Sequence, residues 1–367
     1  MKNIKFLKIL SINLFIFMLL TIIVDLLFGE WRKNFITQRN YFQIPSLIKD
    51  TTLKYDARWI YSSKEPISII YYRDKNGYRS KNAENKKPII LTIGGSTTDQ
   101  RFVTDGETWQ DILDKKIPKF DFVNGGVDGQ SSYGYKSAIS YWHSKYLDPN
   151  KTDSILFYTG TNDVRFISND FTNYDFAQTK FNYFKNLLKD NSFIIDKVLK
   201  LRNRIEFASD SKKTELRKVH NTHYARIEDF KKQGTIYEIK DELKLTDYLK
   251  YTEIYISLLK EAKNKFPNSN LIVVQQQIPG CNFVNKMKVI DRHPDNFEPQ
   301  FCLDLMKVYL IQEKVISRFF KDSKIKIAPM YLKKYIGDDD VYDFVHSNSK
   351  GSLKIAEYIA SFMKLNF

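Results

Sequence analysis

A serine follows a short apolar run in this sequence, and its surroundings suit a nucleophile. Residues 88–93 read PIILTI and are followed by Gly94-Gly95-Ser96-Thr97-Thr98. A serine between a strand and a helix lies near backbone N–H groups that have no partner, and glycine permits the tight turn. The position also suits a bound phosphate, but the Lys-Ser or Lys-Thr of a P-loop is absent at the required spacing. The remaining alternative is that Ser96 only caps a helix.

Asp343 and His346, which are close together near the C-terminus, could activate this hydroxyl. A serine is a weak nucleophile unless a base takes its proton, and histidine supplies such a base near neutral pH. A carboxylate beside the ring fixes its tautomer and stabilises the imidazolium. The other histidines are expected to have structural roles; they are His143, His220, His223 and His293.

Two further segments follow predicted strands and contain N–H donors. Asn124–Ser131 follows the second strand, and its Gly129 can present a bare backbone N–H to a cleft. Gly160–Asp163 follows the third strand, and the side-chain amide of Asn162 can donate to a developing oxyanion. Either segment alone could be an ordinary turn.

Short apolar runs alternate with helical stretches between residues 88 and 364, which indicates a parallel sheet covered by helices on both faces. Strands are predicted at 88–93, 120–123, 154–159, 271–278 and 325–330. Helices are predicted at about 106–116, 133–146, 303–321 and 351–364. Ligands bind beyond the carboxyl ends of such strands, so the candidate residues are expected to meet at one edge of the sheet. The fold class is therefore α/β with a five-stranded parallel sheet.

The chain is expected to have three parts. Residues 1–30 form an anchor, residues 31–87 form a neck and approach segment with a strand at 67–73, and residues 88–367 form the catalytic domain. The stretch 166–268 is rich in Lys, Glu, Asp and Leu and lacks a strand signal. It predicts a helical insertion beside the site, and its charge fits a solvated helix face better than a binding patch.

The segment Ile9–Phe28 is almost continuously apolar. Twenty residues at about 1.5 Å each span roughly 30 Å, the thickness of a bilayer core. Lys2, Lys5 and Lys8 precede it, and a positive flank favours retention of that end in the cytoplasm. The sequence therefore predicts a single-pass helix in the inner (cytoplasmic) membrane, with the catalytic domain on the extracytoplasmic side. A cleaved signal peptide is the alternative.

The net charge of +15 fits a basic solvated surface, attraction to anionic lipids or attraction to an acidic glycan. The sequence contains no zinc-finger spacing, RRM motif or arginine-rich arm, so no nucleic-acid partner is expected. The two cysteines, Cys281 and Cys302, could form a disulfide in an exported domain or remain thiols in the cytoplasm. Neither has metal-ligating neighbours at useful spacing, so we expect no metal and no cofactor.

Four segments, in order, resemble the sequence blocks of the SGNH/GDSL hydrolase family. They are Ile93–Thr98, Asn124–Ser132, Gly160–Asp163 and Asp343–His346. The resemblance covers about 88–163 and 270–364, and Asn76–Ser80 is similar to the approach segment of membrane-anchored bacterial members. Gly-Gly-Ser stands where Gly-Asp-Ser is frequent, which leaves the nucleophile in place. The resemblance implies a three-layer, flavodoxin-like α/β/α arrangement.

The resemblance also implies a role for each candidate residue. Ser96 would attack an acyl carbonyl, His346 would take its proton and Asp343 would orient the ring. The backbone N–H groups of Ser96 and Gly129 and the side chain of Asn162 would form the oxyanion hole. The resulting acyl-enzyme would pass its acyl group to water or to a sugar hydroxyl.

Three functions are therefore compared. The leading hypothesis is a serine esterase or acyltransferase that removes or transfers an O-acetyl group on a carbohydrate outside the inner membrane. The second is a lipid esterase or lysophospholipase, which the apolar segment and basic charge also fit. The third is a non-catalytic glycan-binding or assembly protein on the same scaffold, although a binding module has no need for Asp343 and His346 together. Arg165 could pair with an anionic substrate, but a structural ion pair is the commoner role of such a residue.

Overall fold

The computed structural model describes most of the chain. The described residues are 2–29, 31, 51–58, 60–79, 87–168, 188, 192–195, 197–198, 217–218, 227–294, 300–321 and 323–366. The chain divides into two compact units, which are described separately. The first comprises Met1–Gln43 and Ala177–Glu215, and the second comprises Ile44–Phe176 and Leu216–Phe367.

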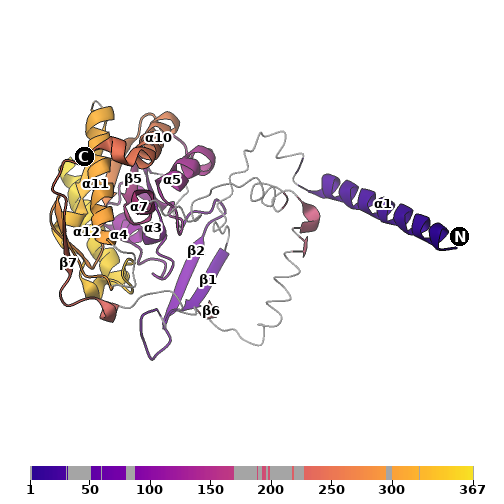
Figure 1. Cartoon of the computed structure of the whole chain (residues 1–367), viewed down its shortest axis with the longest axis horizontal. Helices are drawn as coiled ribbons and strands as arrows, with labels where there is room; N and C mark the ends of the chain where they lie inside the picture. Colours follow the sequence, from indigo (N-terminus) through magenta and orange to yellow (C-terminus); the bar gives the residue numbers. More distant parts are fainter. Residues whose placement is uncertain are drawn as a thin grey trace. The chain divides into compact units, whose positions relative to one another are not determined.

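The first unit contains the long apolar helix α1 (Lys2–Phe28) (Figure 1). Its apolar side chains from Ile9 to Phe28 are largely exposed. Among the described residues, the segment Lys8–Phe28 is the one helix with the length and composition to cross a membrane. A signal sequence near the N-terminus would have the same properties. The predicted apolar helix is thus present, as a candidate membrane span or signal sequence.

The carboxylate of Asp25, near the end of α1, bonds to part of the predicted insertion. Its Oδ1 accepts hydrogen bonds from Ser192 Oγ at 2.8 Å and from the backbone N–H of Ile194 at 3.1 Å. The rings of Phe28 and Phe193 lie 5.6 Å apart. These contacts satisfy an ionisable group that would be costly in an apolar environment without a partner.

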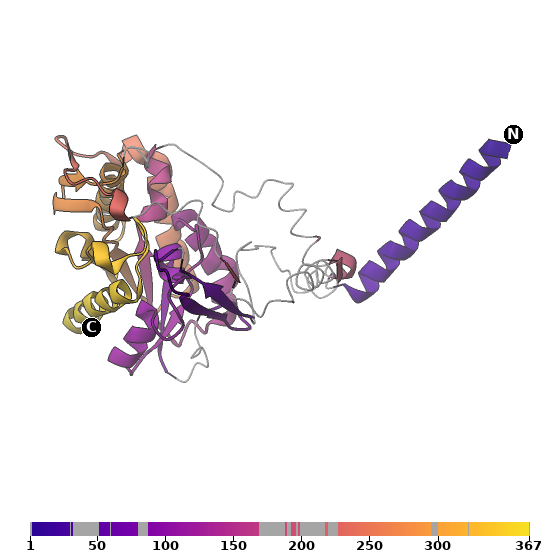
Figure 2. The same cartoon turned by 90° about the horizontal axis from the view of Figure 1, so that it is seen from below.

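The second unit, seen from below in Figure 2, is built on a five-stranded parallel sheet. The order of its strands is β11-β8-β5-β3-β4. The strands are β3 (Ile89–Gly94), β4 (Asp121–Asn124), β5 (Thr152–Thr159), β8 (Asn270–Gln275) and β11 (Ile325–Pro329). Every residue of β3 and β4 is buried. Burial on both faces explains why β3 reads as an almost continuous apolar run rather than as an alternating pattern. The predicted parallel sheet is confirmed.

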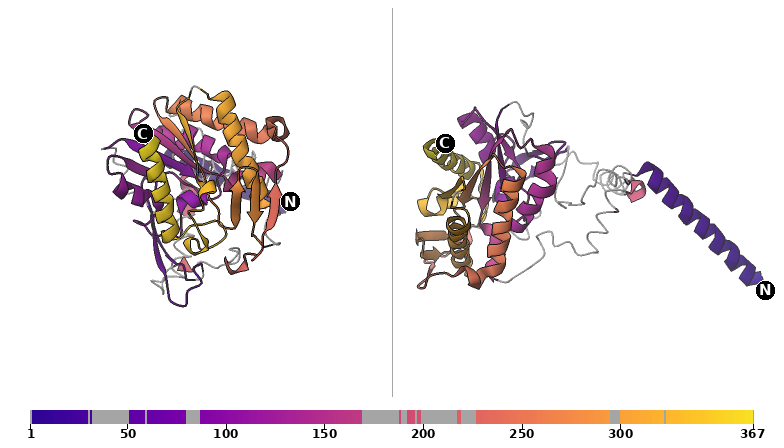
Figure 3. Two further views of the ribbon diagram at one scale, coloured as in Figure 1. Left: turned by 90° about the vertical axis from the view of Figure 1, so that its left-hand side faces the viewer. Right: turned by 90° about the horizontal axis from the view of Figure 1, so that it is seen from above.

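Helices cover both faces of the sheet. They are α4 (Trp109–Lys116), α5 (Ser132–Ala138), α10 (Leu249–Lys265), α11 (Phe301–Phe319) and α12 (Ser349–Asn366). Buried residues of α4 and α12, such as Trp109 and Ile359, pack in one cluster with Ile90 and Phe122 of the sheet. The helices α10 and α11 lie on the opposite side of the sheet from α12 (Figure 3). The predicted three-layer arrangement is therefore confirmed.

A hairpin precedes the sheet in sequence and belongs to the same unit. It consists of β1 (Thr51–Asp56) and β2 (Ser68–Arg73), which pair antiparallel, and the short β6 (Arg217–Lys218) pairs with β1. The strand predicted at 67–73 is β2, whereas β1 was not predicted. Buried residues of the hairpin pack against Phe102 and Tyr342. The predicted segment limits at 30/31 and 87/88 remain predictions.

A small antiparallel sheet, in the order β7-β10-β9, lies within the second unit. Its strands are β7 (Thr235–Glu238), β9 (Cys281–Asn285) and β10 (Lys288–Asp291). The expectation of a helical stretch without strands at 166–268 is corrected by β6 and β7, although α10 is helical as expected. The strand signal was missed because β7 is mostly exposed and has only four residues.

The two cysteines form a disulfide between Cys281, at the start of β9, and Cys302, in α11. This pairing settles the alternative that the sequence left open. The bond closes a loop between residues separated by 21 positions. It fastens the small sheet to the helix layer.

Removal of this disulfide is expected to destabilise the protein. A closed loop of this length lowers the conformational entropy of the unfolded chain, which stabilises the folded state by about 3 kcal/mol. The variant with Cys281→Ser and Cys302→Ser should lose about this much free energy of unfolding in a urea titration under oxidising conditions. A reductant should lower the free energy of unfolding of the wild type and leave that of the double variant unchanged. Equal stability of the two proteins would contradict a stabilising role for the bond.

Candidate active site

Ser96 is the first residue of the short helical turn α3 (Ser96–Asp99), directly after the carboxyl end of β3. The two glycines before it allow close approach of neighbouring segments. A Cβ on Gly95 would collide with the side-chain nitrogen of Asn162, and one on Gly94 would collide with Thr98. A side chain at position 95 would therefore displace Asn162, so Gly95 lets the turn and the Asn162 side chain lie in close contact.

His346 connects Ser96 to Asp343 through two hydrogen bonds. The Nε2 of His346 lies 2.7 Å from the Oγ of Ser96, and its Nδ1 lies 2.7 Å from the Oδ2 of Asp343. The other carboxylate oxygen, Oδ1, accepts from the backbone N–H groups of Val345 at 2.8 Å and His346 at 2.7 Å. The ring of Tyr342 stacks on the imidazole with centroids 5.5 Å apart. The carboxylate and the stacked ring together fix the orientation of the imidazole.

The charges around His346 favour its protonated form. Burial on its own would lower the pKa of His346, but the Asp343 carboxylate, with smaller effects of Asp128 and Asp99, raises it above the ordinary value of 6.5. The Asp343 side chain is itself only 5% exposed. A buried carboxylate that bonds to the imidazole stabilises the imidazolium that forms when the ring accepts a proton.

The two other predicted donors lie on neighbouring segments. Gly129 has a φ of +76°, and a Cβ at this position would meet nothing within 4 Å, so its backbone borders open space. The side-chain N–H of Asn162 donates to the carbonyl of Gln130 at 2.7 Å, which links the segment Gly160–Asp163 to the segment Asn124–Ser132, called the glycine block below. All the predicted site residues therefore lie on three adjoining strand ends and the Asp343–His346 loop.

Two buried side chains that were not assigned a role hold these segments together. Asp163 accepts from the backbone N–H of Ser132 at 2.7 Å, from its hydroxyl at 2.6 Å and from the hydroxyl of Tyr251 at 2.8 Å. Gln276, directly after β8, donates to the hydroxyl of Thr97 at 2.6 Å and accepts from that of Thr161 at 2.5 Å. Their positions after strand ends were the available sequence signal, but their partners were not predictable.

The remaining histidines differ in their surroundings. His143 is fully buried, contacts the hydroxyl of Tyr78 at 3.1 Å, and has its pKa lowered to about 3 by burial, so it is neutral. His293 bonds to Asp291 at 2.9 Å beside the disulfide. Its ring and the two cysteine sulfurs form a cluster of metal-ligand type, but the sulfurs are bonded to each other and offer no thiolate. His220 and His223 lie outside the described residues.

Comparisons with known proteins give structural neighbours only. No protein-family model matches the sequence, and no curated protein matches it. The structure is similar to a GDSL-like lipase from Bacteroides ovatus, with 11% identity and a TM-score of 0.40 over 76% of this chain and 53% of that chain. It is also similar to a member of the lipolytic protein G-D-S-L family from Veillonella parvula, with 15% identity and a TM-score of 0.37 over 75% and 98% of the two chains.

A third similar structure is the acetyl xylan esterase AlAXEase, with 10% identity and a TM-score of 0.40 over 75% of this chain and 98% of that chain. The chain spans about half the length of the Bacteroides ovatus protein and nearly all of the other two. The topology of the sheet and the positions of the four sequence blocks are properties of this chain itself. These properties agree with the three-layer α/β/α arrangement that the resemblance to the SGNH/GDSL hydrolases implies.

Proposed function

We propose that the protein is a serine ester hydrolase of the SGNH family, with Ser96 as nucleophile, His346 as base and Asp343 as the residue that orients the base. The observation that supports this most is the hydrogen-bond chain from Ser96 through His346 to Asp343, with both distances at 2.7 Å. A nucleophile bonded to a base, and a base oriented by a carboxylate, is the arrangement that activates a hydroxyl.

The reaction has two stages. The Oγ of Ser96 attacks the acyl carbon while its proton moves to Nε2 of His346, and the tetrahedral oxyanion accepts hydrogen bonds from the N–H groups of Ser96, Gly129 and Asn162. The carbon–oxygen bond to the alcohol then breaks, and His346 returns the proton to the leaving oxygen. Water attacks the acyl-enzyme in the same way and releases the acid and free Ser96. If a sugar hydroxyl replaces water, the outcome is transfer instead of hydrolysis.

Replacement of Asn162 by alanine is expected to lower kcat of ester hydrolysis by about 10²–10³-fold, because one preformed oxyanion donor typically contributes that much. The KM should change little, because the donor acts on charge that develops in the transition state. Steady-state kinetics with p-nitrophenyl acetate would measure both parameters. An Asn162→Ala enzyme with wild-type kcat would contradict the assignment of this side chain to the oxyanion hole.

The proposed substrate is an O-acylated carbohydrate on the extracytoplasmic side of the inner membrane. The apolar helix with its basic N-terminal flank supports this location. The disulfide supports it as well, because disulfides persist mainly in oxidising compartments. Protease treatment of spheroplasts should degrade the second unit if it lies outside. Protection of that unit in intact spheroplasts would contradict the location.

The substrate class is tested with the full-length protein in detergent. Acetylated xylo-oligosaccharides and a lysophospholipid would be supplied separately, and release of acetate or fatty acid would be measured. We expect acetate release by the wild type and none by Ser96→Ala. Fatty-acid release without acetate release would favour the lipid esterase function, because an apolar helix in the membrane would also bring the enzyme close to lipid substrates. A folded wild type that hydrolyses neither these substrates nor p-nitrophenyl acetate would favour the non-catalytic function.

A further inference from the structure

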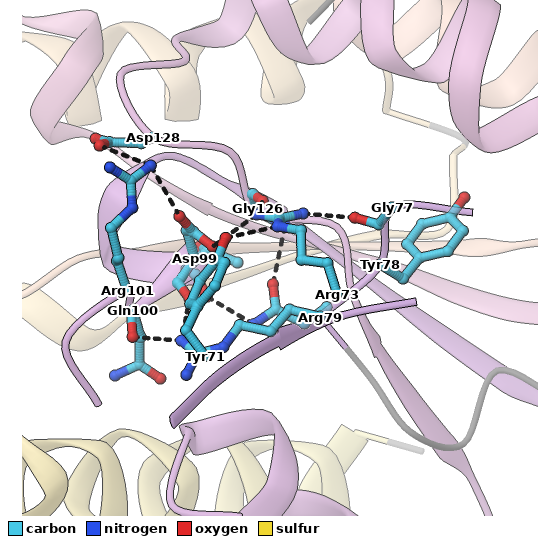
Figure 4. Close-up of polar contacts among 12 residues, drawn as sticks. Tyr71, Arg73, Gly77, Tyr78, Arg79, Asp99, Gln100, Arg101, Gly126 and Asp128 are labelled. Atoms are coloured by element: carbon cyan, nitrogen blue, oxygen red, sulfur yellow. Dashed lines mark hydrogen bonds and ion pairs between the residues drawn. The ribbon is translucent and has the colours of Figure 1, made fainter. Parts of the chain in front are cut away.

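A buried arginine at the end of β2 contacts two of the segments that form the candidate active site (Figure 4). The guanidinium of Arg73 donates through Nη2 to the Oδ1 of Asp99 at 2.6 Å and to the carbonyl of Gly126 at 2.7 Å. Its Nη1 donates to the carbonyl of Gly77 at 2.6 Å, and its Nε donates to the hydroxyl of Tyr71 at 2.6 Å. All three of its nitrogens therefore have partners, and its side chain is 1% exposed.

The two segments that Arg73 bridges are those that contain the proposed backbone donors. Asp99 ends the turn that starts with Ser96, and Gly126 lies three residues before Gly129. A Cβ on Gly126 would collide with the backbone of Asp99, so the two segments are in direct contact. The position of one relative to the other therefore determines the separation of the Ser96 and Gly129 N–H groups.

A second buried arginine holds the end of the same turn. The guanidinium of Arg79 donates to the carbonyls of Asp99, Gln100 and Val103. The last carbonyls of a helical turn have no partner within it, and a cation at this end is favourable. Gln100 has a positive φ of 50°, and its side chain donates to the hydroxyl of Ser347, next to His346, at 2.9 Å. The turn is thus fixed on both sides.

The charge of Arg73 also matters to the site. The Asp99 side chain is 1% exposed, and Arg73 is its closest cation at 2.6 Å, whereas Arg101 lies at 3.9 Å. Removal of one partner of a buried pair leaves an uncompensated charge. Lysine keeps the charge of Arg73 but lacks the planar fork that allows two acceptors to be held in fixed directions.

From these contacts we infer that Arg73 is a positioning residue, which holds the nucleophile turn against the glycine block and so sets the separation of the Ser96 and Gly129 donors. This inference rests on the proposed esterase function. It gives the hairpin, which lies before the parallel sheet in sequence, a part in the geometry of the site.

The test compares Arg73→Lys with Arg58→Lys in the full-length protein. Arg58 pairs with Asp56 at the end of β1 and is 33% exposed, so its replacement makes the same chemical change in the same hairpin away from the turn. We expect Arg73→Lys to lower kcat for p-nitrophenyl acetate by about 10- to 100-fold. The KM should stay within about two-fold of the wild-type value, because only interactions made in the transition state are lost. Affinity for phenylboronic acid, which forms a tetrahedral adduct with the serine, should fall in parallel. The Arg58→Lys protein should match the wild type.

If Arg73 only stabilised the fold, Arg73→Lys would have a lower melting temperature but no loss confined to kcat. Wild-type kcat in folded Arg73→Lys would overturn the inference. If Arg73→Lys does not fold, Asp99→Asn decides, because it keeps the shape of the side chain and removes the ionic contact. A loss confined to kcat in Asp99→Asn would support the inference, and wild-type kcat would overturn it.

Hydrogen–deuterium exchange separates this inference from the proposed function. We expect faster exchange at residues 94–103 and 124–131 in Arg73→Lys than in Arg58→Lys, whether or not the protein hydrolyses esters. If the wild type has no esterase activity, the proposed function fails, and unchanged exchange in both segments would then overturn the positioning role as well.

Discussion

Replacement of Ser96 by alanine is expected to lower kcat of ester hydrolysis by about 10⁶-fold, close to the loss of the whole triad in serine hydrolases. The acyl-enzyme cannot form without the Ser96 hydroxyl, and the oxyanion donors alone give only residual acceleration. Steady-state rates with p-nitrophenyl acetate, after separation from any contaminating esterase, would measure the effect.

The control for this experiment is His346→Ala, which removes the base and keeps the hydroxyl. Because the residues act as a unit, its effect should be similar to that of Ser96→Ala, and the double variant should be no slower than either. Both proteins should retain the melting temperature of the wild type within a few degrees. A Ser96→Ala protein with more than a tenth of the wild-type activity would exclude Ser96 as the nucleophile.

Replacement of Asp343 by asparagine is expected to lower kcat by about 10⁴-fold, because the amide no longer favours the required tautomer of His346 or stabilises its imidazolium. The variant should also change the pH profile. In the wild type, His346 must be neutral to accept the proton, and its pKa is raised above 6.5, chiefly by the Asp343 carboxylate acting against burial. Activity should therefore be lost as the pH falls through this raised pKa. Without the carboxylate the pKa falls, and the acid limb of kcat/KM should move to lower pH.

The matched control is Asp339→Asn, which removes an exposed carboxylate from the chain segment just before the same loop. Its rate and its pH profile should equal those of the wild type. An acid limb that stays in place in Asp343→Asn, or moves equally in Asp339→Asn, would contradict the account of the His346 pKa.

The parallel sheet was predictable because its strands are buried on both faces. The location of the site at the carboxyl ends of these strands follows from the sheet. Both β3 and β5 contain an apolar stretch, and Ser96 and Asn162 come shortly after the ends of these strands. The carboxyl ends of parallel strands share one edge, so residues far apart in sequence could be brought together by topology alone. The order of the four blocks gave the same arrangement through the family resemblance.

The buried residues that hold the segments of the site together were not predictable in the same way. Arg73 meets Asp99 and Gly126 across 26 and 53 residues of sequence, and no periodic pattern marks such pairs. The strand β1 and the small sheet with β7 were missed because they are short, partly exposed strands that depend on tertiary pairing. The sequence alone does not determine the disulfide, because the pairing depends on the distance between two segments in space.

Covalent labelling by a fluorophosphonate would show whether His346 and Asp343 activate Ser96. Full-length wild type, Ser96→Ala and His346→Ala would be treated in detergent, and the modified residue would be identified by peptide mass spectrometry. We expect one adduct, on Ser96 of the wild type, and none on either variant in the same time. Folded wild-type protein that stays unlabelled, or that is labelled equally in Ser96→Ala, would contradict it.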